Sequence, residues 1–182
     1  MRPSPTWPNE SRIAGFSLLE LCIVIAIILI LVTLAVPAIS KYRAYAQRVQ
    51  CMANLRSLYT ATELYVQRYG SWPQIPVPAS DSDADDQAYA QSWISALAPF
   101  GPQQKTWVCP TVQNLLGNPD LSKPENIRVD YIACTFDDKP TTPHQWPRQP
   151  WFAEVGNVHG NGNLIIFTDG SISDLNTVAK KP

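Results

Sequence analysis

The chain has 182 residues and a formal net charge of -1, from 14 Lys and Arg against 15 Asp and Glu. Charged residues are 16% and hydrophobic residues 45%, which excludes a disordered chain and gives no case for nucleic-acid binding. The 17 prolines fall mostly late in the chain, which argues for a loop-rich body there and against a helix bundle.

An uncharged run of twenty residues, 21–40, lies near the amino terminus. As a helix rising 1.5 Å per residue it is about 30 Å long, the thickness of the hydrocarbon layer of a bilayer. The run therefore predicts one membrane-spanning helix. A secretory signal peptide cleaved near Val36-Pro37-Ala38 is the alternative, although the apolar part of such a signal is typically only about 7–15 residues long.

The residues in front of this run form a motif, Gly15-Phe16-Ser17-Leu18-Leu19-Glu20. Glu20 places a carboxylate inside an apolar segment, where a charge normally requires a partner. The string resembles the prepilin signature of type IV pilins and type II secretion pseudopilins. That resemblance implies that a prepilin peptidase cuts between Gly15 and Phe16 on the cytoplasmic side. Phe16 is then N-methylated, and residues 16–182 form the mature chain.

The same resemblance assigns roles to two further residues. Glu20 would pair with the free amino terminus of a neighbouring subunit, and Pro37 resembles the proline that kinks or locally unwinds the helix of the family. The implied partners are copies of this chain, other pilin-like subunits, the prepilin peptidase, an inner-membrane assembly platform and the lipid bilayer.

Basic residues on the two sides of the span leave its orientation open. Arg2 and Arg12 precede it, whereas Lys41, Arg43 and Arg48 follow it. The resemblance to pilins implies a single-pass inner-membrane protein with a cytoplasmic leader and a periplasmic head, which is then assembled into a filament.

Beyond the span a helical pattern continues to residue 69, where Gly70 and then Pro73 end it. Its apolar residues recur every three or four positions: Tyr42, Tyr45, Val49, Met52, Leu55, Leu58, Ala61, Tyr65 and Tyr69. We therefore expect one long helix over residues 16–69. The predicted organisation is a leader (1–15), a transmembrane helix (16–40), an amphipathic stalk helix (41–69) and an α+β head (70–182).

The head pattern predicts a small antiparallel sheet of three or four strands that covers the stalk helix. A short helix is expected over residues 87–99, a strand over 128–136, a proline-rich loop over 137–150, and a hairpin of 163–167 with 171–175. Asp169-Gly170 supplies the turn of that hairpin. The resulting fold class is α+β and pilin-like.

Three aspartates, Asp81, Asp83 and Asp85, form the weak calcium candidate of the sequence. A calcium-binding loop that starts at Asp81 needs a Gly where Asp86 stands and a Glu where Ser92 stands, so a solvated acidic turn is the better interpretation. No metal or cofactor is expected.

His159, nine residues and then Asp169-Gly170 resemble the carboxyl-terminal signature of a pseudopilin-like family, although Ser171 stands where that family has a second His. We interpret His159, Asp169 and Gly170 as structural residues of a turn. Of the four cysteines, Cys22 lies in the apolar run. Cys109 and Cys134 are the first choice for a disulfide, with Cys51–Cys109 as the alternative, because sequence does not fix connectivity.

The sequence thus predicts a structural pilin or pseudopilin subunit and not an enzyme, because it contains no nucleophile with a base and no phosphate-binding loop. A type II secretion pseudopilus and a type IV pilus are both open. The alternative function is a membrane-tethered periplasmic module that binds glycans through exposed tryptophans, drawn from Trp72, Trp93, Trp107, Trp146 and Trp151.

Overall fold

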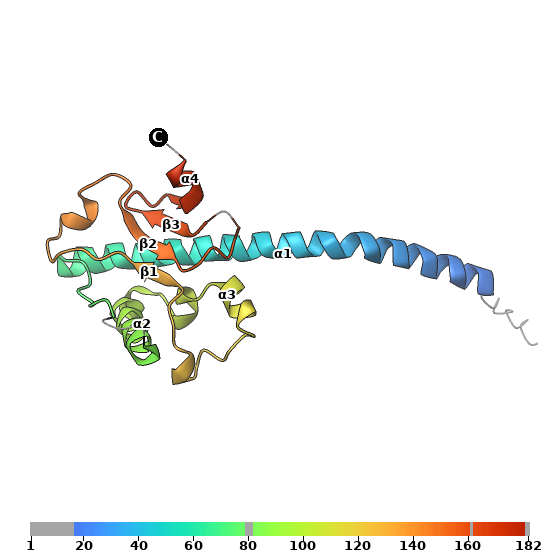
Figure 1. Ribbon diagram of the computed structural model, residues 1–182, viewed down its shortest axis with the longest axis horizontal. Coiled ribbons are helices and arrows are strands. Elements are labelled where there is room, and N and C mark those ends of the chain that lie inside the picture. The colour runs from blue at the N-terminus through green and yellow to red at the C-terminus, as the bar shows by residue number, and fades with distance from the viewer. Residues whose placement is uncertain (1–16, 79–81, 161, 181–182) are drawn as a thin grey trace, which may run out of the picture. The chain divides into compact units, whose positions relative to one another are not determined.

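The computed structural model describes residues 17–78, 82–160 and 162–180, without the side chains of residues 37 and 38. Gly15, Phe16 and Asp81 lie outside the described residues. The chain divides into two compact units, Met1–Tyr42 and Arg43–Pro182, which we describe separately. Helix α1 (Leu18–Tyr69) contributes residues to both of them (Figure 1).

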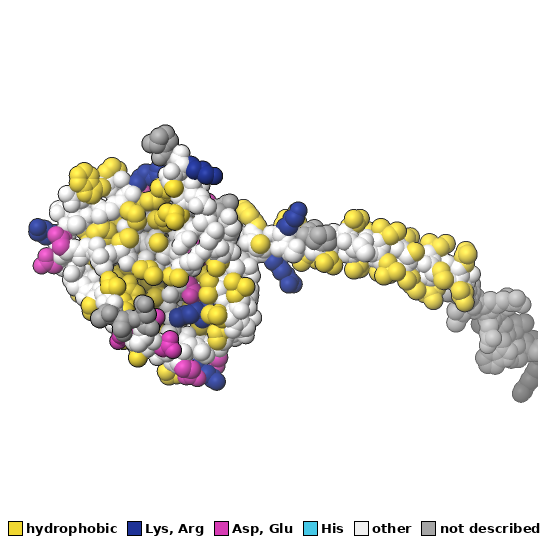
Figure 2. All heavy atoms as spheres, in the orientation of Figure 1, with side chains coloured by type: hydrophobic (Ala, Val, Ile, Leu, Met, Phe, Trp, Pro, Cys, Tyr) yellow, Lys and Arg dark blue, Asp and Glu magenta, His cyan; other side chains and the backbone are white. Residues whose placement is uncertain are grey.

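In the first unit, α1 is apolar and its side chains are exposed from residue 18 to residue 36. Hydrophobic side chains cover this part of the helix in Figure 2. An 18-residue window reaches a mean hydropathy of 3.1 and none of it is buried. By length and composition, the helix is suited to cross a membrane.

In the second unit, α1 buries one face in the core. Its buried apolar residues are Cys51, Leu55, Leu58, Ala61 and Val66. The predicted stripe is correct for Leu55, Leu58 and Ala61. It is wrong at its two ends, because four of its members are exposed: Tyr42, Tyr45, Val49 and Tyr69. At about 100° per residue, Tyr42 and Val49 lie roughly 140° and 120° around the helix from Leu55 and Tyr45 lies roughly 80° from it, so these three side chains turn away from the buried face.

Helix α1 ends where the sequence predicts. Gly70 has a φ of +71° and its N–H donates to the carbonyl of Val66 at 2.8 Å, a conformation that favours glycine. The chain then turns Trp72 into the core, where it is 1% exposed and its ring contacts those of Trp93, Phe136, Trp151 and Phe152.

The head contains a four-stranded antiparallel sheet in sequence order: β1 (Tyr131–Ala133), β2 (Pro150–Glu154), β3 (Leu164–Phe167) and β4 (Ile172–Asp174). Residues of this sheet and of α1 belong to one hydrophobic core. The predicted α+β fold is therefore confirmed. The structure adds β2, which pairs with both β1 and β3 and has an irregular register between Pro150 and Phe152.

The predicted hairpin is formed by β3 and β4. Gly170 has a φ of +72°, and Asp169 Oδ1 accepts a hydrogen bond from the Ser171 N–H at 2.9 Å. These two residues therefore make the turn, as the sequence indicated. The strand expected over 128–136 is shorter, because only Tyr131–Ala133 pairs with β2.

Helices and short turns surround the sheet. Helix α2 (Asp83–Leu97) begins earlier than predicted, because Ser82 Oγ accepts the Asp85 N–H at 3.2 Å and caps it. Two shorter helices, α3 (Pro110–Leu115) and α4 (Leu175–Ala179), were not predicted. The 3-10 turns are Ala98–Phe100, Gln104–Trp107, Pro124–Asn126 and Thr142–His144.

The start of α2 also explains the acidic run. Asp83 and Asp85 lie in the first turn, where the helix dipole favours negative charge. Because a helix turns by about 100° per residue, the side chains of Asp83 and Asp85 leave the axis about 200° apart. They therefore do not converge on one ion. The calcium candidate is therefore not supported by Asp83 and Asp85, and Asp81 lies outside the described residues.

The tryptophans are mainly core residues. Trp72, Trp93, Trp107 and Trp151 are at most 2% exposed, whereas Trp146 is 62% exposed. A sugar stacks on an accessible aromatic face, so the four buried rings are not available for it. Among the tryptophans of the described head, only Trp146 is therefore exposed enough to bind a glycan.

Candidate functional site

The predicted assembly segment begins with Glu20, which lies in the first turn of α1 and is exposed. Apolar exposed side chains surround it in the sequence: Leu18, Leu19, Leu21 and Ile23. A carboxylate in such a segment is unfavourable in lipid unless an opposite charge meets it. The cleavage site between Gly15 and Phe16 lies outside the described residues.

Pro37 lies within α1, which continues through it. Because proline has no N–H, the carbonyl of Thr33 loses its helical hydrogen bond there. The kink at Pro37 that the pilin resemblance implies stays a prediction.

The second candidate site is a buried group of four side chains in the head. Cys51 comes from α1, Cys109 precedes α3, Glu154 ends β2, and His159 lies in the connection between β2 and β3. One ligand-type atom from each lies within 4.8 Å of the corresponding atoms of the other three. Four segments that are distant in sequence therefore meet at one point, which we call the thiol–carboxylate cluster.

Distances inside the thiol–carboxylate cluster are short. The Cys51 and Cys109 sulfurs are 2.6 Å apart, and Cys109 Sγ is 3.7 Å from His159 Nε2. His159 Nε2 lies 3.2 Å from Glu154 Oε1, and the two side chains are 3% and 0% exposed. The other carboxylate oxygen, Glu154 Oε2, is buried and has no hydrogen-bond partner among the described residues.

Burial and mutual contact change the acidity of these groups. Burial, and then the hydrogen bond with Cys109, raise the pKa of Glu154 to about 7. A hydrogen bond from the Cys51 thiol lowers the pKa of Cys109 to about 6, whereas that contact and burial raise the pKa of Cys51.

Neighbouring groups hold the cluster in place. The Cys109 N–H donates to Asp130 Oδ2 at 2.8 Å, and Asn163 Nδ2 donates to the Glu154 carbonyl at 2.8 Å. Asn157 Oδ1 accepts the N–H groups of Gly160 and Gly162 at 3.0 and 2.9 Å, which folds the loop around His159.

The structure brings together residues that the sequence assigned separately. Cys109 meets Cys51, the alternative partner, and Cys134 continues the alternation of β1 on the face opposite to Tyr131. All four cysteines are free thiols in this structure, so the disulfide pairing stays a prediction.

His159 lies in the connection between β2 and β3, and its ring contacts Glu154 and Cys109. Its role as a structural residue stays a prediction. Glu154 was not predicted from the sequence. The only signal for it was a lone acid between Phe152 and Val155, which does not specify its partners.

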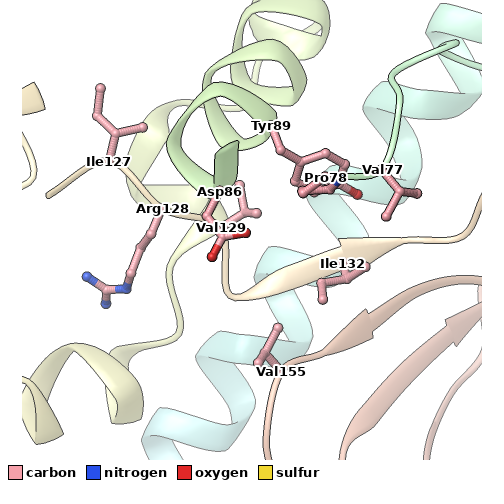
Figure 3. Close-up of a pocket in the computed structure, with 9 residues that line it drawn as sticks. All are labelled: Val77, Pro78, Asp86, Tyr89, Ile127, Arg128, Val129, Ile132 and Val155. Carbon is pink, nitrogen blue, oxygen red and sulfur yellow. The ribbon is translucent and has the colours of Figure 1, made fainter. Parts of the chain in front are cut away.

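A surface cavity of about 380 Å³ lies elsewhere in the head, lined by Val77, Pro78, Asp86, Tyr89, Ile127, Arg128, Val129, Ile132 and Val155. Figure 3 shows Asp86 and Tyr89 on α2 and Ile132 on β1 around it. The lining is mainly aliphatic and contains no paired nucleophile and base. It offers apolar contact and does not indicate a reaction.

Comparisons with known proteins agree on one class. The chain is 43% identical over 54 residues to the type IV major pilin protein PilA of Myxococcus xanthus (strain DK1622), covering 30% of this chain and 24% of that protein. It is 39% identical over 72 residues to the type IV major pilin protein PilE1 of Neisseria gonorrhoeae, covering 37% of this chain and 34% of that protein.

The chain thus spans about a quarter and a third of the lengths of these two relatives. No family model and no solved structure matches it. The similarity supports a pilin-like protein, in agreement with the long apolar helix and the small antiparallel sheet.

Proposed function

We propose that this chain is a subunit of a pilin-type filament, anchored in the inner membrane by residues 16–40 before assembly. The observation that carries the proposal is helix α1: its first part exposes an apolar surface with Glu20 in the first turn, and its second part is packed into a folded head. The similarity to two type IV major pilins supports it.

Assembly follows from the physical chemistry of this helix. Helices of neighbouring subunits replace lipid around residues 18–36, which exchanges one apolar environment for another at little cost. Glu20 then meets the free amino group of a neighbouring Phe16, so that two charges that are unfavourable in lipid neutralise each other. This pairing sets the axial position of one subunit relative to the next.

The proposal includes the processing that this pairing needs. Prepilin peptidase removes residues 1–15, and Phe16 receives a methyl group on its new amino terminus. The leader faces the cytoplasm, the head faces the periplasm, and an inner-membrane platform assembles the subunits with copies of this chain or other pilin-like subunits. The filament is a type IV pilus or a type II secretion pseudopilus, and the chain is not an enzyme.

Processing is tested by the intact mass and amino-terminal sequence of the full chain made with and without a prepilin peptidase. We expect a chain that starts at Phe16 and carries one methyl group only when the peptidase is present. A Gly15→Val variant serves as the control, because a branched side chain at the cut should leave the leader in place.

Two results would contradict the processing proposal. A leader that stays attached although the peptidase cleaves another prepilin in the same cells would indicate a tethered head. A chain that starts near Ile39 would instead identify residues 21–36 as an ordinary secretory signal.

A further inference from the structure

The geometry points to a structural zinc site in the head, in which Cys51, Cys109, His159 and Glu154 bind one Zn²⁺ ion. Two thiolates, one imidazole nitrogen and one carboxylate oxygen are all ordinary zinc ligands, and four protein donors close a tetrahedral site. The four donor atoms lie within 4.8 Å of one another. This inference does not depend on the proposed function in a filament.

The burial of the donors is the first argument. Glu154 and His159 are 0% and 3% exposed in their side chains, and Cys51 and Cys109 are fully buried. Acids and imidazoles are rarely buried to this degree unless they are paired or bind a metal. Zinc neutralises most of the negative charge that two thiolates and one carboxylate would carry there.

Glu154 Oε2 also points to a bound ion, because it is a buried carboxylate oxygen without a hydrogen-bond partner among the described residues. A buried polar atom of this kind calls for an explanation, and a bound ion is one of the few available. A Cys51–Cys109 disulfide would satisfy the two sulfurs, but it would leave both this oxygen and the convergence of Glu154 and His159 on those sulfurs unexplained.

The distances between the donor atoms fit one zinc ion after a small movement of the two sulfurs. Cys109 Sγ to His159 Nε2 at 3.7 Å and His159 Nε2 to Glu154 Oε1 at 3.2 Å are close to the separations of ligands around one zinc ion. The two sulfurs, 2.6 Å apart, must separate by about 1 Å to bind zinc at about 2.3 Å each.

Zinc binding would release the thiol protons of Cys51 and Cys109 and any proton on Glu154. Once bound, the ion links α1, the residue before α3, the end of β2 and the loop of His159. It therefore fixes the head to the part of α1 that continues into the apolar segment. Asp130 and Asn163, through their bonds to the backbone of Cys109 and Glu154, act as positioning residues.

The test measures zinc and thiols together on the full chain, isolated from cells in mild detergent with oxygen excluded. We expect one zinc per chain, with Cys51 and Cys109 as free thiols that react with an alkylating reagent only after a chelator has removed the metal. Cobalt(II), substituted for zinc, should give the absorption bands of tetrahedral thiolate ligation.

Variants separate the ligands from general packing. Glu154→Gln keeps shape and should weaken zinc binding, as should His159→Gln, by more than the roughly 10- to 100-fold that loss of an outer-shell partner costs, while Cys109→Ser should abolish it. Cys134→Ser is the matched control, a half-buried cysteine outside the cluster that should leave one zinc per chain. Near-ultraviolet circular dichroism checks that each variant is folded.

Three results would overturn the zinc proposal. The first is a chain isolated with Cys51 and Cys109 joined in a disulfide, which makes it two hydrogen atoms lighter. The second is a reduced, folded chain that takes up no zinc from an equimolar solution. The third is a Glu154→Gln chain, shown to be folded, that binds zinc as tightly as the unchanged protein.

Discussion

Replacement of Glu20 by Ala is expected to leave cleavage and membrane insertion intact and to reduce filament material to less than about a tenth. Removal of one partner of a buried ion pair costs about 3–5 kcal/mol, because the other charge is left without compensation. In this filament the abandoned charge would be the amino group of Phe16 in a neighbouring subunit. The unassembled monomer, in contrast, is more stable in the lipid bilayer without the carboxylate.

The measurement compares the fraction of the chain that sediments with sheared filaments for Glu20→Ala, Glu20→Gln and Leu19→Ala. Both Glu20 variants should fail, since Gln has the shape of Glu without its charge, whereas Leu19→Ala keeps the charge and should assemble. Normal filaments from Glu20→Gln would show that the carboxylate has no role in register.

Replacement of Trp72 by Ala is expected to destabilise the head by about 3–5 kcal/mol, a large part of the total stability of a domain. Trp72 is 1% exposed and its ring contacts four other aromatic rings, so truncation leaves a cavity at the centre of the core. Trp146, at 62% exposed, is the matched control, and its change to Ala should alter stability by less than about 0.5 kcal/mol.

Urea unfolding of the full chain in detergent measures this difference, with near-ultraviolet circular dichroism as the signal for the head. A Trp146→Ala variant as unstable as Trp72→Ala would contradict the assignment of these rings to core and surface. If Trp146→Ala instead removed binding to a polysaccharide, the glycan alternative would gain its first support.

Local signals predicted the parts of the fold that local chemistry determines. Gly70 ends α1 and Asp169-Gly170 turns the last hairpin, because each position needs a backbone conformation that glycine adopts easily. The uncharged run from 21 to 40 similarly predicted a membrane-spanning helix, and the structure has an apolar helix there whose side chains are exposed from residue 18 to residue 36. Such signals operate within a few residues and require no knowledge of the tertiary fold.

Long-range packing was not predictable in the same way. Strand β2 begins with Pro150 and follows a proline-rich loop, so its own sequence does not indicate a strand. It is stabilised by pairing with β1 on one side and β3 on the other. Tyr42, Tyr45 and Val49 recur at helical spacing, but they turn away from the face of α1 that packs into the core and are exposed. Periodicity identifies an apolar face without showing what packs against it.

The thiol–carboxylate cluster was missed for a related reason. Its four residues come from four segments, with no spacing that resembles a known metal motif. From the sequence, Cys51 and Cys109 were assigned to disulfide pairing and His159 to a turn, and no role was predicted for Glu154. Only the fold brings these donors together, and the zinc proposal therefore departs from the expectation of no metal.

The most direct test of the filament proposal is electron microscopy of cells that contain a pilin assembly system and express this chain with an epitope tag after Pro182. We expect gold-labelled antibody in rows along filaments, whose extracted subunits begin at N-methylated Phe16. Label dispersed over the membrane, in cells that cleave the leader and assemble another pilin, would show that the chain is a membrane-anchored head and not a filament subunit.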